Sequence, residues 1–193
     1  MPFLNLASLR LCTESEGPGK RTAVWVQGCK RNCPGCCNPD MQEFRKNRIV
    51  DTADLVSVIS NAADTYQIEG ITMLGGEPML QAEGLAYLAE WCHKQKLSVI
   101  VFTGYLYQEL LEMNNHFVLK LLKHTDILVD GPFIEELYDT ERDWIGSTNQ
   151  KVYFLTEFYK PGIEFENHSH SMELNISDKT IQMNGWPYCV AGE

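Results

Sequence analysis

The chain has 193 residues, of which 44% are hydrophobic and 10% aromatic, and this is enough for the buried core of one folded domain. It is too short for a complete eight-fold β/α barrel, which usually needs about 250 residues. With 16 Lys and Arg against 26 Asp and Glu, the net charge is −10, which argues against broad, charge-driven binding to nucleic acid or to an anionic membrane.

No apolar run approaches the roughly 18 residues of a membrane span, and the N-terminal segment lacks the basic and long apolar regions of a signal peptide. We therefore expect a cytoplasmic protein whose cysteines stay reduced. Seven cysteines also fit a disulfide framework poorly, because the number is odd. Four of them fall between Cys29 and Cys37, and such crowding indicates metal binding.

Strand and helix patterns alternate along the chain. In chain order we expect a strand at 21–27, a helix at 52–66, a strand at 70–74, a helix at 81–95, a strand at 97–102, a helix at 107–123 and a strand at 126–129. The third helix is expected to break near Asn114. After Tyr138 the pattern loosens, with a short strand at 152–154 and a small hairpin at the sheet edge in the remainder.

This βαβαβ order predicts a parallel sheet with right-handed crossovers. Ligands of such sheets bind beyond the carboxyl ends of the strands. Four unusual segments follow directly on strand ends: the cysteine loop, GGEP at 75–78, TGY at 103–105 and DGPF at 130–133. The sequence therefore predicts one site to which all four segments contribute.

Cys29, Cys33 and Cys36 form a C-x3-C-x2-C triplet in one tight loop. Soft thiolate ligands at this spacing favour an iron–sulfur cluster, and three ligands for four irons leave one iron open to a substrate or cofactor. The alternatives are a structural zinc ion, with Cys37 or a distant His as fourth ligand, and ordinary thiols. Because adjacent residues usually point apart, we interpret Cys37 as a packing residue near the cluster.

The triplet after a strand, followed later by a GGEP strand end, resembles the radical S-adenosylmethionine (SAM) enzymes. The resemblance extends to the activating proteins of anaerobic ribonucleotide reductase and covers the chain from about Gly17 to Val152. The motifs that carry it, in order, are GPGKRTAVWVQGC, CPGCCNPD, GGEP, VFTGY, LVDGPF and WIGSTNQKV. It implies one α/β domain over 1–193, a partial parallel β/α barrel of the radical SAM type with its core at about 17–155 and a small C-terminal appendix at 156–193.

The resemblance also implies an activity and its cofactors. A [4Fe-4S] cluster would cleave SAM reductively to a 5′-deoxyadenosyl radical, which abstracts hydrogen from a backbone glycine of a glycyl radical enzyme, the anaerobic ribonucleotide reductase. A flavodoxin or ferredoxin would donate the electron. A short, incomplete barrel leaves one side of the site open, and this suits a protein substrate that supplies the missing wall.

Two other functions remain open. One is a small radical SAM enzyme of the same lineage that modifies a peptide or metabolite, and the longer tail after about Leu155 favours it. The other is a non-enzymatic protein that binds zinc or an iron–sulfur cluster. Three separate glycine-bearing strand ends argue against the latter, since a structural zinc module does not need them.

The resemblance assigns site residues one motif at a time, and each has a plainer alternative. The cluster ligands are Cys29, Cys33 and Cys36; Gly75, Gly76 and Glu77 bind the amino group of SAM; Thr103 and Gly104 line its pocket. By their own chemistry, Asp130 is expected to hydrogen-bond a ribose hydroxyl or to position the peptide of the partner, and Asn38 to hydrogen-bond near the cofactor. The alternatives are a strand-to-helix turn capped by Glu77, a simple turn at Thr103, a helix cap at Asp130 and a turn residue at Asn38.

Several other polar residues have weaker signals. Gly146, Ser147, Asn149 and Gln150 form a polar loop that either binds ligand or ties down the backbone. His168 and His170 are interpreted as solvated loop residues, and Cys12, Cys92 and Cys189 lack the spacing of a second cluster. The acidic residues Glu135, Glu136, Asp139, Glu141 and Asp143 are expected to form a solvated face, or a docking edge if the partner is basic.

Overall fold

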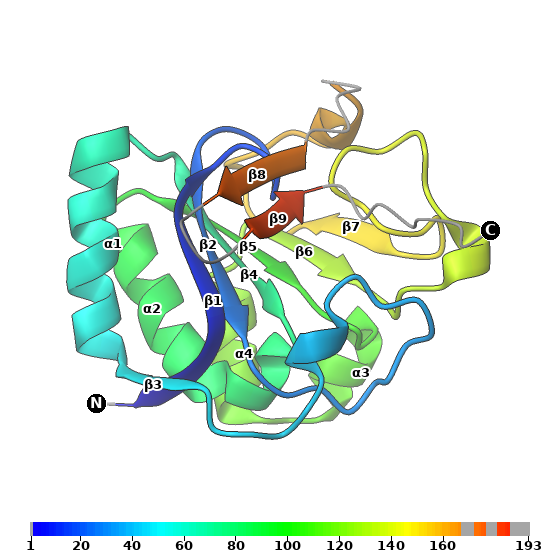
Figure 1. Ribbon diagram of the computed structural model, residues 1–193, viewed down its shortest axis with the longest axis horizontal. Helices are drawn as coiled ribbons and strands as arrows, with labels where there is room; N and C mark the ends of the chain where they lie inside the picture. Colours follow the sequence, from blue (N-terminus) through cyan, green and yellow to red (C-terminus); the bar gives the residue numbers. More distant parts are fainter. Residues whose placement is uncertain (1, 167–171, 177–180, 186–193) are drawn as a thin grey trace.

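The computed structural model describes residues 2–166, 172–176 and 181–185, and its centre is a seven-stranded sheet in the order β3-β1-β2-β4-β5-β6-β7 (Figure 1). The strands of this sheet are β1 (Phe3–Thr13), β2 (Arg21–Val26), β3 (Arg48–Asp51), β4 (Gly70–Gly75), β5 (Ser98–Phe102), β6 (Ile127–Asp130) and β7 (Lys151–Phe154). A separate hairpin consists of β8 (Met172–Ile176) and β9 (Ile181–Gly185). The helices are α1 (Thr52–Tyr66), α2 (Ala82–Lys94), α3 (Tyr107–Glu112) and α4 (His116–Lys123), with short 3-10 turns at η1 (Pro39–Met41) and η2 (Pro78–Gln81).

The expected parallel strands form the middle of the sheet, because β2, β4, β5 and β6 pair in parallel. The outer strands were not expected to run as they do. β1 pairs antiparallel with β2 and with β3, and β7 pairs antiparallel with β6. The sheet is therefore mixed and open, and it does not close into a barrel.

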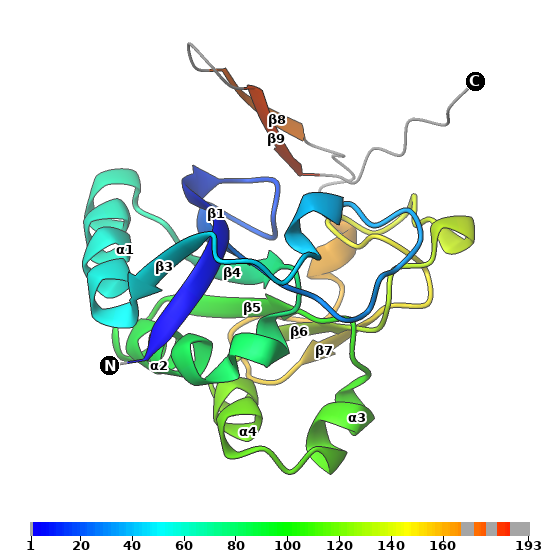
Figure 2. The ribbon, with the colours of Figure 1, turned by 60° about the horizontal axis from the view of Figure 1, so that its bottom comes forward.

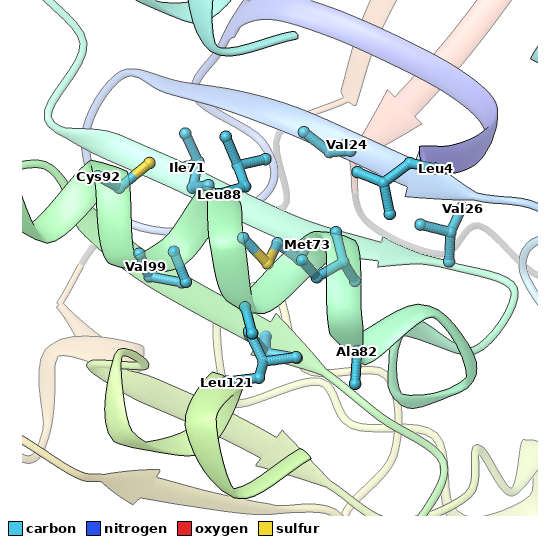
Figure 3. Packing of buried hydrophobic residues seen from close by; sticks show 14 of the residues in the cluster. Leu4, Val24, Val26, Ile71, Met73, Ala82, Leu88, Cys92, Val99 and Leu121 are labelled. Carbon is cyan, nitrogen blue, oxygen red and sulfur yellow. The ribbon is translucent and has the colours of Figure 1, made fainter. Parts of the chain in front are cut away.

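The four helices cover one face of the sheet (Figure 2). Alternate strand residues point to this face, where Val24, Met73 and Val99 pack against α2 residues such as Leu88 (Figure 3). Their neighbours in the strands, such as Trp25 and Ile100, belong to smaller clusters on the opposite face. We call this opposite side the free face, since loops rather than helices lie over it. In the described part of the chain, no helix is both long and apolar enough to cross a bilayer.

The expected break in the third helix separates α3 from α4. Asn114 has a left-handed backbone conformation with φ of 46°, which ends the first helix. Asn115 then caps the second, because its side chain accepts hydrogen bonds from the backbone N–H groups of Phe117 and Val118. Two short asparagine side chains thus allow the chain to turn while both helices stay on the sheet.

A buried cation lies on the free face, at the ends of the strands away from the cysteine loop. Arg21 is fully buried, and its Nε donates to Thr72 Oγ1 at 2.8 Å. Its two terminal nitrogens donate to the Tyr159 hydroxyl and to the Ile71 carbonyl, each at 2.8 Å. Tyr159 also hydrogen-bonds Glu69. Arg21 therefore joins β2, β4 and a segment beyond β7 in one network, as a buried charge requires.

The hairpin β8–β9 does not extend the edge of the main sheet, as the sequence had led us to expect. It forms its own two-stranded sheet on the side of the free face (Figure 2). Polar contacts to the loop after β1 hold it there: Glu173 accepts from the Glu14 N–H, and Glu16 accepts from the Gly185 N–H, each at 2.8 Å. The predicted edge pairing was wrong because it was inferred only from the alternation of apolar and polar residues, whereas polar contacts hold the hairpin on the loop after β1. His168, His170 and Cys189 lie outside the described residues.

Burial under this hairpin raises the pKa of Glu16 from 4.5 to about 8. Between these values the folded chain keeps a proton that the unfolded chain releases, so folding stability falls as the pH rises. For Glu16→Gln we expect a flatter profile, because the neutral amide keeps the acceptor oxygen for Gly185. The difference in slope should approach about 1.4 kcal/mol per pH unit within that window.

Urea unfolding of both proteins at intervals from pH 4.5 to pH 8 measures this difference. Well below pH 4.5 the two pH slopes should agree, since Glu16 is then protonated in both the folded and the unfolded chain. Parallel profiles over the whole range would contradict the burial of a protonated Glu16.

Candidate functional site

The cysteine loop leaves the sheet at the end of β2 and returns at η1. Its base is closed by backbone hydrogen bonds from Gly28 N to Met41 O at 2.8 Å and from Cys29 N to Gln42 O at 2.9 Å. Inside the loop, Gly35 has a left-handed φ of 65° and the Cys36 N–H donates to the Cys33 carbonyl, so the chain folds back on itself. The triplet is thus held on a loop that is fixed at both ends.

Backbone N–H groups donate to two of the three sulfurs. The donor to Cys29 Sγ is Arg31 at 3.3 Å, and the donor to Cys36 Sγ is Asn38 at 3.4 Å. Burial raises the pKa of Cys29 and of Cys33, while the hydrogen bond from Arg31 acts in the opposite direction at Cys29. Hydrogen bonds to sulfur stabilise the thiolate ligands of iron–sulfur clusters, so the loop suits such a cluster.

The spacing of the thiols also bears on the kind of metal site. Among the residues that the structure describes, no three Cys, His, Asp or Glu side chains are grouped as ligands of a single metal ion. In a four-iron cluster each cysteine binds a different iron, so its ligands lie further apart than those of one ion. The three half-buried cysteines all border one cleft, and Cys37 is exposed on its rim.

The GGEP segment lies directly against the base of the cysteine loop. Gly76 N donates to Val26 O at 2.8 Å and Glu77 N donates to Gly28 O at 2.9 Å. A Cβ atom on Gly76 would lie 2.4 Å from Gly28 O, which is backbone and cannot give way. Glycine at this position therefore permits the contact between the end of β4 and the cysteine loop.

The Glu77 carboxylate is buried and fully engaged. It caps η2 by accepting from Met79 N at 3.0 Å, and it accepts from Thr103 Oγ1 at 2.8 Å and Gly104 N at 2.9 Å. Only 1% of the residue is exposed, and this burial raises the pKa of Glu77. The capping alternative is thus realised, and the same carboxylate ties the end of β4 to the end of β5. A contact between Glu77 and a ligand stays a prediction.

Arg31 joins the cysteine loop to the segment after β5. Its guanidinium carbon lies 4.1 Å from the centre of the Tyr105 ring, and its NH2 group pairs with Glu109 Oε2 at 2.8 Å. Gly104 lies between Arg31 and Glu77: an added Cβ would be 2.9 Å from Arg31 Cγ and 3.4 Å from Glu77 Oε2. Sequence reasoning missed Arg31, because its partners lie more than 70 residues away.

Asp130 and the polar loop after it mainly hold the backbone. Asp130 is 1% exposed and accepts from Tyr107 N at 2.7 Å and Lys151 N at 3.3 Å, so it joins β6 to the start of α3 and to β7. Gln150 accepts from the N–H groups of Gly146 and Ser147 and donates to the Gly131 carbonyl. Of the two roles left open for this loop, tying down the backbone is the one its hydrogen bonds serve. A ligand contact at Asp130 stays a prediction.

The acidic stretch is only partly the solvated face that the sequence suggested. Asp139 and Asp143 are 2% and 3% exposed, although Glu135, Glu136 and Glu141 are exposed. Asp139 accepts from the Arg142 side chain at 2.6 Å and from the N–H groups of Glu141 and Arg142. The expectation was wrong for Asp139 because one neighbouring arginine turns its carboxylate inward.

All these segments border one cleft of about 850 Å³ at the carboxyl ends of the parallel strands. The cysteine triplet, Asn38, Gly75–Glu77 and Thr103–Gly104 lie along it, so the strand ends meet as predicted. Apolar side chains of the free face also line it, namely Trp25, Leu74, Phe102 and Trp144. The hairpin contributes Met172, Met183, Asn184 and Gly185, residues that the sequence had not placed there. Asp130 does not border the cleft, but its neighbour Gly131 does.

Comparison with known proteins adds independent evidence. Residues 15–153 match the family model described as a 4Fe-4S single cluster domain. The anaerobic ribonucleoside-triphosphate reductase-activating protein of Enterobacteria phage T4 is 27% identical over 158 residues, covering 80% of this chain and 96% of that protein. The proteins of the same name from Haemophilus influenzae and Escherichia coli K12 are each 30% identical. They cover 71% and 72% of this chain and 89% and 91% of their own lengths.

We expect Gly76→Ala to lower the free energy of unfolding by about 1 to 3 kcal/mol, because the new methyl group must push the β4 turn away from the Gly28 carbonyl. Gly146→Ala is the matched control and should cost less. The atoms nearest to its Cβ would belong to the side chains of Phe133 and Gln150, at 3.0 Å and 3.2 Å, and side chains can shift where backbone cannot. Thermal or urea unfolding measures both, and equal losses would contradict the close approach at Gly76.

Proposed function

Since the chain belongs to the family of anaerobic ribonucleoside-triphosphate reductase-activating proteins and carries a 4Fe-4S single cluster domain, we propose that it is a radical SAM activase. Its substrate would be a backbone glycine of an anaerobic ribonucleotide reductase. The observation that carries this proposal is the single cleft bordered by the cysteine triplet, the Gly75–Glu77 turn and the Thr103–Gly104 turn. We also propose that this open sheet is an incomplete barrel of the radical SAM type.

The three cysteines would hold three irons of a [4Fe-4S] cluster and leave the fourth open. The backbone N–H groups of Arg31 and Asn38 would stabilise two of the sulfurs. When bound, the cluster supplies the electron that cleaves SAM to methionine and a 5′-deoxyadenosyl radical, which takes a hydrogen atom from the target glycine. A flavodoxin or ferredoxin would supply the electron to the protein.

The protein's own contribution is binding, orientation and exclusion of water. Gly75 and Gly76 border the cleft at the end of β4, where the amino group of SAM would bind beside Glu77. Thr103 and Gly104 would border the ligand from β5, and Asn38 from the cysteine loop. The apolar side chains of Trp25, Phe102 and Trp144 would keep water from the reacting atoms.

One observation favours a second candidate, in which the same chemistry acts on a peptide or metabolite. The hairpin lies beyond residues 15–153, the part that matches the family model, and yet it borders the cleft. An added wall could narrow the site for a smaller substrate. The two candidates differ only in the hydrogen donor, so one experiment can distinguish them.

Replacing Cys29, Cys33 or Cys36 by Ala should abolish the iron-dependent visible absorbance after anaerobic reconstitution, because each is expected to bind a different iron. Cys37→Ala should retain it, and so should Cys12→Ala, a half-buried thiol outside the loop. The wild type should contain about four irons and four sulfides per chain. Loss of the cluster in Cys37→Ala, together with its retention in any one variant of the triplet, would overturn the ligand assignment.

The proposed reaction is tested with reconstituted protein, dithionite and SAM under anaerobic conditions. Mass spectrometry should detect 5′-deoxyadenosine, and electron paramagnetic resonance should detect a glycyl radical on added anaerobic ribonucleotide reductase. Deoxyadenosine without a radical on the reductase would favour the peptide or metabolite substrate. No deoxyadenosine from a protein with a full cluster would refute the radical SAM assignment.

A further inference from the structure

The β8–β9 hairpin has one apolar face, and most of that face is exposed. Side chains alternate along β8, so Met172, Leu174 and Ile176 lie on one face. Met183 is the direct cross-strand partner of Leu174 and therefore shares it. These four side chains, which we call the apolar hairpin face, are between 48% and 72% exposed.

The other face of the hairpin makes the contacts to the protein body. Glu173 accepts from Glu14 N at 2.8 Å, and Asn184 donates to Thr13 Oγ1 at 2.9 Å. This reverses the usual arrangement, in which the apolar face of a sheet packs on the core and the polar face meets water. A contiguous exposed apolar patch of this kind is typical of an interaction surface.

The apolar hairpin face continues directly into the cleft. Met172 and Met183 belong to this face and also border the cleft that holds the cysteine triplet and Glu77. A protein whose backbone glycine enters the cleft can therefore contact the two methionines. Its surface beside that glycine then meets the rest of the apolar hairpin face. Methionine side chains are flexible and polarizable, so they adapt to the shape of a partner.

The charge of the whole chain indicates the chemistry of the partner. The cleft itself is of mixed charge, since Arg10 and Arg31 border it together with Asp40 and Glu135, but the chain carries a net charge of −10. This net negative charge disfavours an acidic partner and steers a basic one toward the protein. The complementary surface is an apolar patch surrounded by Lys and Arg.

Building on the proposed function, we propose that the apolar hairpin face is a docking surface for the protein substrate. It contacts an apolar, basic-rimmed patch of the glycyl radical enzyme beside the glycine that enters the cleft. The family domain at 15–153 carries the cluster loop and the turns, while the hairpin beyond it adds affinity for one partner. A second copy of this chain is the competing occupant.

The test measures the affinity of the reconstituted full chain for the anaerobic ribonucleotide reductase of the same organism. Leu174→Gln combined with Ile176→Gln makes the exposed face polar without touching the cleft lining. We expect the dissociation constant to rise at least tenfold. Asn175→Ser, in the same strand but on the opposite face, is the matched control and should change the constant less than twofold. Both variants should unfold at the wild-type temperature, because these side chains are exposed.

Three results would count against the docking surface. Equal affinity of the double variant and the wild type would overturn it. So would a shift from dimer to monomer in sedimentation with unchanged affinity for the reductase, because the face would then be a self-interface. A wild type that forms no deoxyadenosine would refute the proposed function itself, and with it the partner. Where the wild type forms deoxyadenosine and binds the reductase, the double variant tests the hairpin alone.

Discussion

The site depends on one close contact between two stretches of backbone, the turn after β4 and the base of the cysteine loop. Glu77 N donates to Gly28 O, and Gly76 leaves no room for a side chain between them. The contact brings the cysteine loop and the turn together at the carboxyl end of the sheet. The buried Glu77 carboxylate then extends it to β5 through Thr103 and Gly104. A residue that the sequence singled out for a ligand thus also holds the surrounding structure together, and the two roles are compatible because Glu77 borders the cleft.

Arg31 completes the same assembly from the outside. It lies between two proposed cluster ligands in sequence, and its cation rests on Tyr105 and pairs with Glu109. The cysteine loop is therefore held at its base by backbone hydrogen bonds and near its middle by a charged side chain. The surface-side ion pair contributes little energy by itself. The ion pair instead contributes to positioning, because it fixes the cysteine loop against the segment that follows β5.

The parallel part of the fold could be predicted because each signal was local. Strands at β2, β4, β5 and β6 are short apolar runs between helices, and GGEP marks the end of β4 by its glycines. The break at Asn114 and Asn115 follows from their own backbone and capping preferences. The strands β1 and β3 were missed because β1 can be recognised only as the partner of β2, and β3 only as the partner of β1. The contacts of Arg31 and the burial of Asp139 were missed for a similar reason. A charged residue in a sequence predicts exposure to solvent, and its burial can be predicted only when its partner is known. The hairpin was expected, but its polar contacts with Glu16 were not. An alternating pattern does not show which face of a hairpin will pack against the rest of the protein.

The chain thus separates chemistry from recognition along its length. Residues 15–153 match the model of a 4Fe-4S single cluster domain. The match to the Haemophilus influenzae and Escherichia coli proteins covers about nine-tenths of the length of each. Such a domain must be left open on one side if its substrate is the backbone of another folded protein. An open cleft carries little information about which protein should enter. A hairpin attached by its polar face would supply this specificity without changing the cluster loop or the turns. It would place an apolar surface beside the cleft, where the partner binds. Specificity can then change through the hairpin while the geometry around Cys29, Gly76 and Glu77 stays fixed.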